Sequence, residues 1–208
     1  MGARCERAVR LAFAAYWDGA TPTANEVGEV DEQIDRDEVD IRALVLRILA
    51  LRQPVARDLR FLATALRLIT DLERVGDEAV NITERIAVGD DETKTSVGNL
   101  LPGMSVDAQD MLRVTLQAFV DGDAEAAATV FARDDAVDKC CAEVMRTMID
   151  YIASHPKDAA AGLRVIRTAK HLERIADHAT NVAEEVIFMV RGDDVRHARG
   201  GRSDRPHR

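Results

Sequence analysis

DLERVGDEAVNITE at residues 71–84 and HLERIADHATNVAE at residues 171–184 are two versions of one phrase. Seven of its fourteen positions are identical, and the Val/Ile, Gly/Ala and Ile/Val exchanges keep size and apolarity. A match of this length at a distance of 100 residues indicates an internal duplication, and such repeats predict a repeated structural unit. The fold therefore depends on what this unit is and how far it extends.

The repeat extends well beyond this phrase. Residues 15–35 align with residues 118–138 at an offset of 103, with matching Ala, Asp, Gly and Val residues and a matching pair of Asp at the end. Pro54 corresponds to Pro156 at an offset of 102, and small changes of length in turns explain this drift. The sequence thus predicts two halves of similar structure.

Composition favours helices in both halves. Gly (12) and Pro (5) are few and aromatic residues make up 4%, while Ala, Leu, Arg, Glu and Asp dominate, which favours helix over strand. Gly19 and Gly122 separate the first helix of each half from the second, and the prolines of RQP (52–54) and SHP (154–156) separate the second from the third, because proline cannot continue a helix. The predicted helices are 3–18, 23–52 and 55–88 in the first half and 104–121, 124–153 and 157–190 in the second.

These helices divide the chain into four segments. Residues 1–88 are predicted to form one three-helix bundle and residues 104–190 a second one. Residues 89–103 have the Gly, Asp and Ser content of a linker, and residues 191–208 are Arg-rich without apolar periodicity, which predicts a disordered tail. We expect an all-α protein of two tandem three-helix bundles related by a pseudo-twofold operation.

The third helix of each half has an apolar stripe with a spacing of three to four residues, which predicts a core face. The stripes consist of Leu68, Leu72, Val75, Ala79, Ile82 and Ile86 in the first half and of Leu172, Ile175, Ala179, Val182, Val186 and Val190 in the second.

Charge and cysteine content exclude several classes of protein. The chain has 28 basic and 37 acidic residues, a net charge of −9, which argues against non-specific nucleic-acid binding. The first residues lack the apolar region of a signal peptide, and no apolar run approaches the ~20 residues that span a bilayer. We therefore expect a cytoplasmic protein. Cys5, Cys140 and Cys141 are odd in number without CxxC spacing, which predicts reduced, mostly buried thiols.

The second and third helices of each half carry pairs of acidic residues four positions apart. Such like-charged pairs destabilise a helix by about 0.2–0.5 kcal/mol each. A solvated surface would explain a single pair, but recurrence at matched places in both halves suggests a shared use. The pairs are Asp31/Asp35 with Glu73/Asp77 in the first half, and Asp134/Asp138 with Glu173/Asp177 in the second.

An antiparallel arrangement about Pro54 or Pro156 puts the four carboxylates of each half at one height along the bundle. Their positions around the helices let the two pairs turn either toward each other or away, depending on the handedness of the bundle. If the two pairs turn toward each other, the four carboxylates converge and need cations to neutralise their charge. Oxygen ligands favour Mg²⁺, Mn²⁺ or iron over a thiolate-type zinc site, so we interpret these eight residues as metal ligands.

No catalytic apparatus is visible in the sequence. His171 and His178 are seven residues apart, about 10 Å along a helix, so they cannot chelate one ion together and are interpreted as surface histidines. The absence of Glu-x-x-His on the long helices argues against a ferritin-like di-iron oxidase. No P-loop, GxSxG or GxGxxG motif occurs either, and we predict no catalytic residue.

DLERVGDEAVNI, HLERIADHATNV and LALRQPVARDLR (49–60) together resemble the PhoU family of phosphate-signalling regulators, and the resemblance covers nearly the whole chain up to about residue 190. It implies tandem three-helix bundles, each with a metal cluster (iron, manganese, magnesium or zinc) on the acidic pairs. Members of the family usually have a longer first helix, and MGARCERAVRLAF resembles the middle of that helix.

The resemblance also implies a function. It implies a negative regulator of the phosphate-starvation response, which links the ATPase subunit of a phosphate ABC transporter to a membrane sensor histidine kinase. Such a protein acts through partner contacts rather than catalysis, and a homodimer is a further expectation. Two alternatives remain: a metal-dependent enzyme or metal buffer, against which the missing general acid or base weighs, and a metal-free helical interaction module.

Overall fold

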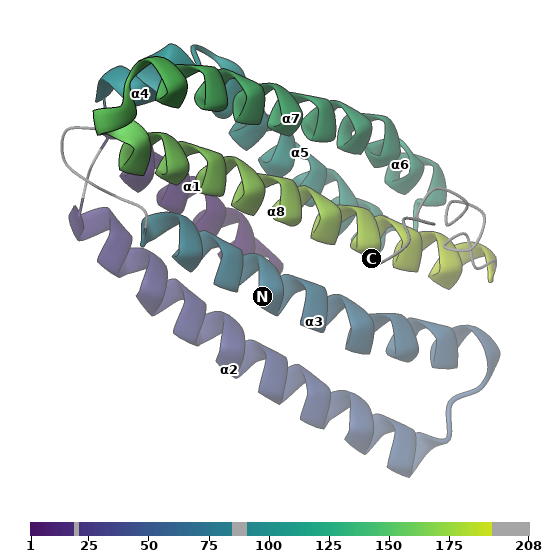
Figure 1. Cartoon of the computed structure of the whole chain (residues 1–208). Helices are drawn as coiled ribbons and strands as arrows, with labels where there is room; N and C mark the ends of the chain where they lie inside the picture. The colour runs from purple at the N-terminus through teal and green to yellow at the C-terminus, as the bar shows by residue number, and fades with distance from the viewer. Residues whose placement is uncertain (19–20, 85–90, 193–208) are drawn as a thin grey trace, which may run out of the picture.

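The computed structural model describes residues 1–18, 21–84 and 91–192, and every regular element in these ranges is a helix (Figure 1). The predicted all-α fold of two tandem bundles is confirmed. No helix in the described ranges is both long and apolar enough to cross a membrane. The elements are α1 (Gly2–Asp18), α2 (Thr21–Arg52), α3 (Ala56–Thr83), α4 (Asp91–Ser96), α5 (Leu100–Asp121), α6 (Ala124–Ala128), α7 (Val130–Ser154), a 3₁₀ turn (Pro156–Asp158) and α8 (Ala159–Arg191).

In the first bundle, α2 and α3 form an antiparallel hairpin whose turn lies at the predicted RQP sequence (Figure 1). Gln53 has a left-handed backbone with φ of 46°, which ends α2, and Pro54 has no N–H group with which to continue the helix. α1 packs against both long helices. These three helices are the predicted first bundle.

In the second bundle, α5 ends at Gly122, whose φ is 64°. Asp123 Oδ1 then accepts hydrogen bonds from the N–H groups of Glu125 (3.0 Å) and Ala126 (2.9 Å), which starts the next helix. The predicted helix 124–153 is divided into α6 and α7 at Thr129, whose N–H bonds to the carbonyl of Ala126 three residues back (3.2 Å). α5, α7 and α8 pack together as the second bundle.

The segment predicted as a linker contains regular structure. α4 lies within residues 89–103, and α5 begins at Leu100 rather than at residue 104. The sequence pattern missed α4 because its residues, DETKTS, include no apolar side chain, although Val97 and Leu101, which follow it, are buried. The predicted last turns of the third helix (85–88), part of the linker (89–90) and most of the predicted tail (193–208) lie outside the described residues.

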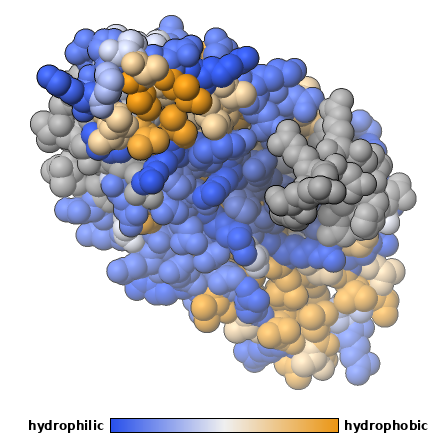
Figure 2. All heavy atoms as spheres, in the orientation of Figure 1, coloured by the Kyte–Doolittle hydropathy of each residue, from blue (hydrophilic) through white to orange (hydrophobic). Residues whose placement is uncertain are grey.

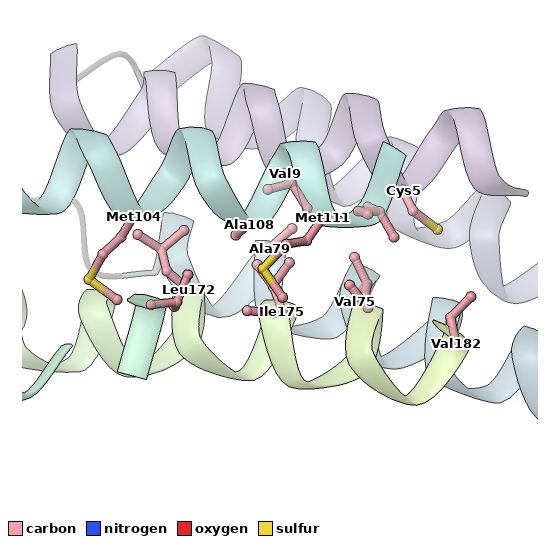
Figure 3. Packing of buried hydrophobic residues seen from close by; sticks show 14 of the residues in the cluster. Cys5, Val9, Val75, Ala79, Met104, Ala108, Met111, Leu172, Ile175 and Val182 are labelled. Atoms are coloured by element: carbon pink, nitrogen blue, oxygen red, sulfur yellow. The ribbon is translucent and has the colours of Figure 1, made fainter. Parts of the chain in front are cut away.

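The two bundles share one hydrophobic core, because α3 and α8 pack against each other more extensively than any other pair of helices. They run antiparallel: Thr64 near the start of α3 donates to the carbonyl of Glu185 near the end of α8 (3.4 Å). Figure 3 shows side chains of α1 and α5 meeting those of α3 and α8 in this core. The duplication therefore produced two units that bury one face against each other.

Most of the predicted core stripes are buried, with one exception. Val190 is 39% exposed, so its assignment to the core was wrong; it lies in the last turn of α8, which ends at Arg191. Ile86 lies outside the described residues. The buried members are Leu68, Leu72, Val75, Ala79, Ile82, Leu172, Ile175, Ala179, Val182 and Val186.

The cysteines are free thiols, as predicted. Cys5 and Cys141 are buried and Cys140 is half-buried. Burial raises the pKa of the Cys5 thiol to about 12. A thiol with such a pKa is protonated at neutral pH and behaves as a small apolar side chain.

Candidate metal centres

The first acidic cluster lies where α2 crosses α3. Asp31 is inserted so closely against α3 that a Cβ atom on Gly76 would stand 2.4 Å from Asp31 Oδ1. That oxygen is buried and makes no hydrogen bond to any residue in the described part of the chain. A buried, unbonded carboxylate oxygen is costly, so Asp31 is the member of the cluster whose position most requires explanation.

The negative charges of the other three acids of this half help to raise the pKa of Asp31, and two of these acids have raised pKa values themselves. Burial, followed by the charges of Asp35, Asp77 and Glu73, raises the pKa of Asp31 to about 6. Burial and then Asp77 raise the pKa of Glu73, and burial and then Asp35 raise that of Asp77. Of the two rotations that the sequence left open, α2 and α3 adopt the one that brings the acids together.

The second cluster repeats this arrangement on α7 and α8. Burial and the charges of Asp134, Glu173 and Asp138 raise the pKa of Asp177 to about 6. Burial and then Glu173 raise the pKa of Asp138. Ala176 stands where the first half has Gly76, so here a methyl group fits between the helices.

A lysine distinguishes the second cluster from the first. Lys170 Nζ donates to both carboxylate oxygens of Glu173, at 2.9 and 2.6 Å, and this bond raises the pKa of the lysine. The corresponding residue of the first half is Thr70, whose hydroxyl donates to the carbonyl of Leu66 (3.4 Å). The second cluster thus contains a positive charge that the first lacks at this position.

The donor chemistry of both clusters fits a hard cation, since every candidate ligand is a carboxylate oxygen. As the side chains stand, however, no group of three or more His, Cys, Asp or Glu residues in the described ranges could hold a metal ion. Binding would therefore require these carboxylates to adopt other side-chain conformations. Asp35, Asp77 and Asp177 are exposed and have room to do so.

Two histidine contacts between the bundles were missed by the sequence analysis. His171 is buried, and its Nδ1 lies 2.6 Å from Glu78 Oε2 on α3. His178 Nδ1 lies 2.9 Å from Asp71 Oδ1. Their interpretation as surface histidines was therefore wrong, because their helix face packs on α3 instead of facing water.

A signal for these contacts was present in the sequence. Asp71 and Glu78 are seven residues apart on α3, as His171 and His178 are on α8. Equal spacings on antiparallel helices allow both contacts to form at once. Arg174 adds a contact to Glu78 at 3.4 Å, and these bonds help to lower the pKa of that carboxyl despite its burial.

Comparison with known proteins places the chain in a family. The PhoU domain family matches residues 1–86 and 101–186. The chain is 37% identical over 198 residues to the phosphate-specific transport system accessory protein PhoU homolog of Pseudomonas putida, which covers 95% of this chain and 77% of the relative. The homolog of the same name from Pseudomonas aeruginosa is also 37% identical over 198 residues, covering 95% of this chain and 82% of that relative.

Solved structures agree with this assignment. The crystal structure of PhoU from Pseudomonas aeruginosa superposes with a TM-score of 0.86 at 35% identity, covering 93% of each chain. The phosphate transport system regulatory protein PhoU from Streptococcus pneumoniae, at 23% identity, shares the fold with a TM-score of 0.83, covering 93% of this chain and 91% of that one. With a PhoU domain in each half and relatives of this identity over most of their length, the chain belongs to the PhoU family.

Proposed function

We propose that this protein is a cytoplasmic negative regulator of the phosphate-starvation response. In this role it couples the ATPase subunit of a phosphate ABC transporter to a membrane sensor histidine kinase, limits phosphate uptake, and acts without catalysis. The observation that carries the proposal is the pair of PhoU domains in this chain. Its relatives are named as accessory proteins of the phosphate-specific transport system.

The surface of the molecule supports a role in contacts rather than catalysis. Three grooves in the described part of the chain are lined by residues of α1, α2, α3, α5 and α8 and the turn after α5, and none of the eight acidic residues of the two clusters lines these three. An enzyme built on these acids would need them in an enclosed pocket with a general acid or base.

A reporter assay tests the proposed function. Deleting the gene should derepress a phosphate-starvation promoter in phosphate-rich medium, because the kinase would no longer be restrained. Expression of the wild-type chain should restore repression. Unchanged repression after deletion would reject the regulatory role.

We further propose that the two acidic clusters bind metal ions such as Mn²⁺, Mg²⁺, iron or Zn²⁺, through Asp31, Asp35, Glu73 and Asp77 in one half and Asp134, Asp138, Glu173 and Asp177 in the other. A bound cation would neutralise carboxylates that now raise one another's pKa. The buried Asp31 Oδ1 supports this proposal, because it has no other partner in the described residues.

Thermal unfolding in chelator-treated protein titrated with Mn²⁺ tests this proposal. A ligand that binds only the folded state stabilises it by about 2.7 kcal/mol at a hundredfold excess over Kd. Asp77→Asn should lose the gain from the first cluster and Asp177→Asn that from the second. Lys170→Met should strengthen binding at the second cluster by removing the competing ammonium group. A melting temperature of the wild type that does not respond to Mn²⁺ would leave a metal-free adaptor.

A further inference from the structure

The four long helices form a layer, and the two hairpins of the molecule lie within it. Figure 1 shows α2, α3, α8 and α7 side by side in this order, with α1 and α5 behind them, and neighbours in this order pack on each other. Because α3 and α8 run antiparallel, the α2–α3 turn lies at one end of the layer and the α7–α8 turn at the other. The face turned away from α1 and α5 therefore has two hairpin ends in pseudo-twofold positions.

Each hairpin end carries a large apolar side chain on this face. Leu46 of α2 and Ile149 of α7 occupy equivalent positions of the two repeats, at the offset of 103, and are 54% and 58% exposed. Leu46 follows Asp35 by 11 residues, and Ile149 follows Asp138 by the same number. Eleven residues are close to three whole turns of an α-helix, so both side chains lie on the same strip of their helix as the acidic cluster.

The adjoining helix of each hairpin adds a second apolar side chain. Leu59 of α3 and Leu163 of α8 are exposed, and they precede Glu73 and Asp177 by 14 residues, close to four turns. Figure 2 shows two apolar areas on this face, one over the α7–α8 end at the upper left and one over the α2–α3 end at the lower right, with hydrophilic surface between them. Exposed apolar areas bordered by polar residues are typical of interaction sites.

Both hairpin ends are positively charged in an acidic chain. Residues 36–67 contain seven basic and four acidic residues. The equivalent residues 139–170 contain six basic and three acidic residues. Each segment thus has a net charge of +3, whereas the whole chain has −9. A complementary partner has acidic residues beside its apolar ones.

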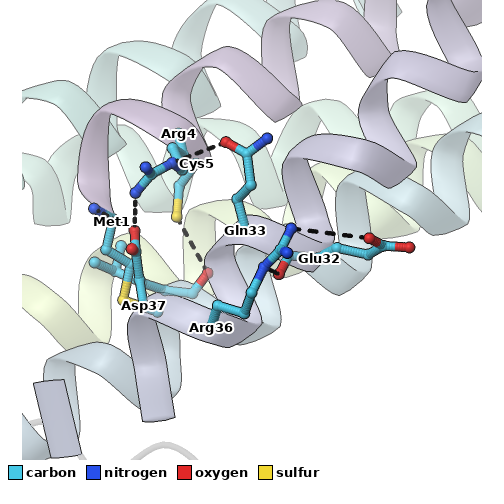
Figure 4. Close-up of polar contacts among 8 residues, drawn as sticks. Met1, Arg4, Cys5, Glu32, Gln33, Arg36 and Asp37 are labelled. Atoms are coloured by element: carbon cyan, nitrogen blue, oxygen red, sulfur yellow. Dashed lines mark hydrogen bonds and ion pairs between the residues drawn. The ribbon is translucent and has the colours of Figure 1, made fainter. Parts of the chain in front are cut away.

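The arginines of these segments differ in whether they are paired. Arg36, beside the acidic pair of α2, donates from Nε to the carbonyl of Glu32 (2.9 Å) and lies 3.9 Å from its carboxylate (Figure 4). Arg47, Arg146 and Arg167, nearer the turns, are exposed and make no ion pair within the described ranges. Their charges are therefore available to the carboxylates of a partner.

The backbone of this face restricts the form of the partner. All four elements of the layer are α-helices, whose N–H and C=O groups bond within each helix, so the face has no sheet edge to which a strand could add. A partner segment must satisfy its own backbone hydrogen bonds, as an amphipathic helix does.

We propose that this face binds a twofold-symmetric partner protein, which places one acidic amphipathic helix on each hairpin end. The two ends are equivalent by duplication, and a symmetric dimer presents two equal helices about a twofold axis. The hydrophilic surface between the two apolar areas (Figure 2) fits two separate helices better than a continuous lipid surface. A second copy of the chain would bring positive ends together. The proposal rests on the proposed function in one respect: a regulator that acts by contact requires a docking surface.

Fluorescence anisotropy with labelled peptides tests the proposal on the full 208-residue chain. A single peptide of about 18 residues carries Leu at helical spacing on one face and Glu beside it. An isomer with Leu scattered around the helix is the control, and it should bind about tenfold more weakly. A tandem peptide joins two copies by a Gly/Ser linker of about 10, 20, 30 or 40 residues. With the best linker it should bind at least about tenfold more tightly than the single peptide, because the second contact is then intramolecular.

Matched variants locate the two sites. Leu46→Gln or Ile149→Gln alone should reduce the affinity of the tandem peptide to about that of the single peptide, and both together should abolish binding. Val106→Gln, at a position 60% exposed on α5 behind the layer, should leave binding unchanged. In the Leu46→Gln background, Arg146→Gln combined with Arg167→Gln should reduce the dependence of binding on salt. Circular dichroism of each variant verifies that the helices are intact.

Several results would overturn the proposal. A tandem peptide that binds no more tightly than the single peptide at any linker length would show that the two ends do not bind one partner together. Equal effects of Ile149→Gln and Val106→Gln would place the site elsewhere. Sedimentation showing a dimer of the chain that Leu46→Gln dissociates would assign the face to a second copy, and binding to vesicles with anionic lipid, without binding to the peptides, would assign it to a membrane. Tandem binding together with unchanged repression after gene deletion would keep the docking face and reject the regulatory role.

Discussion

Gly76 has no room for a side chain, whereas Gly28 on α2 has no atom within 4 Å of the place where a Cβ would stand. Replacing either residue by Ala gives the same gain in helix propensity, about 1 kcal/mol. At Gly76 the added methyl would meet Asp31 Oδ1 at 2.4 Å and Ile34 at 3.2 Å. The difference between the two variants therefore isolates the packing of α2 on α3.

We expect Gly28→Ala to raise the free energy of unfolding by about 0.5–1 kcal/mol. Gly76→Ala should instead have a lower free energy of unfolding than the wild type, because overpacking costs about 1–3 kcal/mol. Urea unfolding of both variants measures the difference. Equal stabilisation by both substitutions would mean that Asp31 moves aside freely.

The pKa of Asp31, raised to about 6, gives a second prediction at this scale. An aspartate in an unfolded chain has a pKa of about 3.9, so the folded state holds the proton more tightly. The stability that the protonated form provides is present below about pH 4 and is lost as the pH rises through about 6. In metal-free protein, Asp31→Asn should reduce this loss and be more stable than the wild type at pH 7.

Denaturant unfolding between pH 4 and 7 measures this effect. Asp40→Asn, at an exposed position on the same helix, should follow the wild type at every pH. A wild type with constant stability over this range, or an Asp31→Asn variant with the same slope, would show that Asp31 is not held among like charges.

Among the elements, α4 shows what sequence periodicity misses. Its six residues, DETKTS, have the composition of a linker, yet Lys94 is buried and donates to the carbonyls of Tyr16 (2.6 Å) and Trp17 (3.3 Å) at the end of α1. The ammonium group also lies 4.8 Å from the centre of the Tyr16 ring. The lysine satisfies carbonyl groups that the end of a helix leaves unbonded, and a long-range contact of this kind has no local signature in the sequence.

Lys94→Met should therefore destabilise the protein by about 1.5–3 kcal/mol, the usual range for hydrogen bonds to charged groups. Lys139→Met, at an exposed site on α7, should change the free energy of unfolding by less than about 0.5 kcal/mol. Chemical denaturation compares the two. Equal small effects would mean that α4 is only a tether between the bundles.

For the whole molecule, the sequence predicted the parts better than their assembly. The repeat at 71–84 and 171–184, the turn prolines and the apolar stripes led to the correct helices, because all of these are local periodic signals. The packing of α3 on α8 was not foreseen, since one stripe indicates a buried face but not its partner. For the same reason His171 was misjudged, and the convergence of Asp31 and Asp77 stayed open until the rotation of the helices was known.

The shared core makes a prediction about cooperativity. Leu72 and Leu172 occupy the same place in the two repeats and are both buried in one continuous cluster. Truncation of a well-packed leucine to alanine costs about 2–5 kcal/mol. If the bundles were independent, Leu72→Ala would lower the transition of the first half only. Because α3 and α8 bury their faces against each other, neither bundle retains its core when the other unfolds, so each variant should lower the same single transition by a similar amount.

Calorimetry measures this directly: the calorimetric and van't Hoff enthalpies should agree in both variants, and two resolved transitions in either one would show that the halves unfold separately.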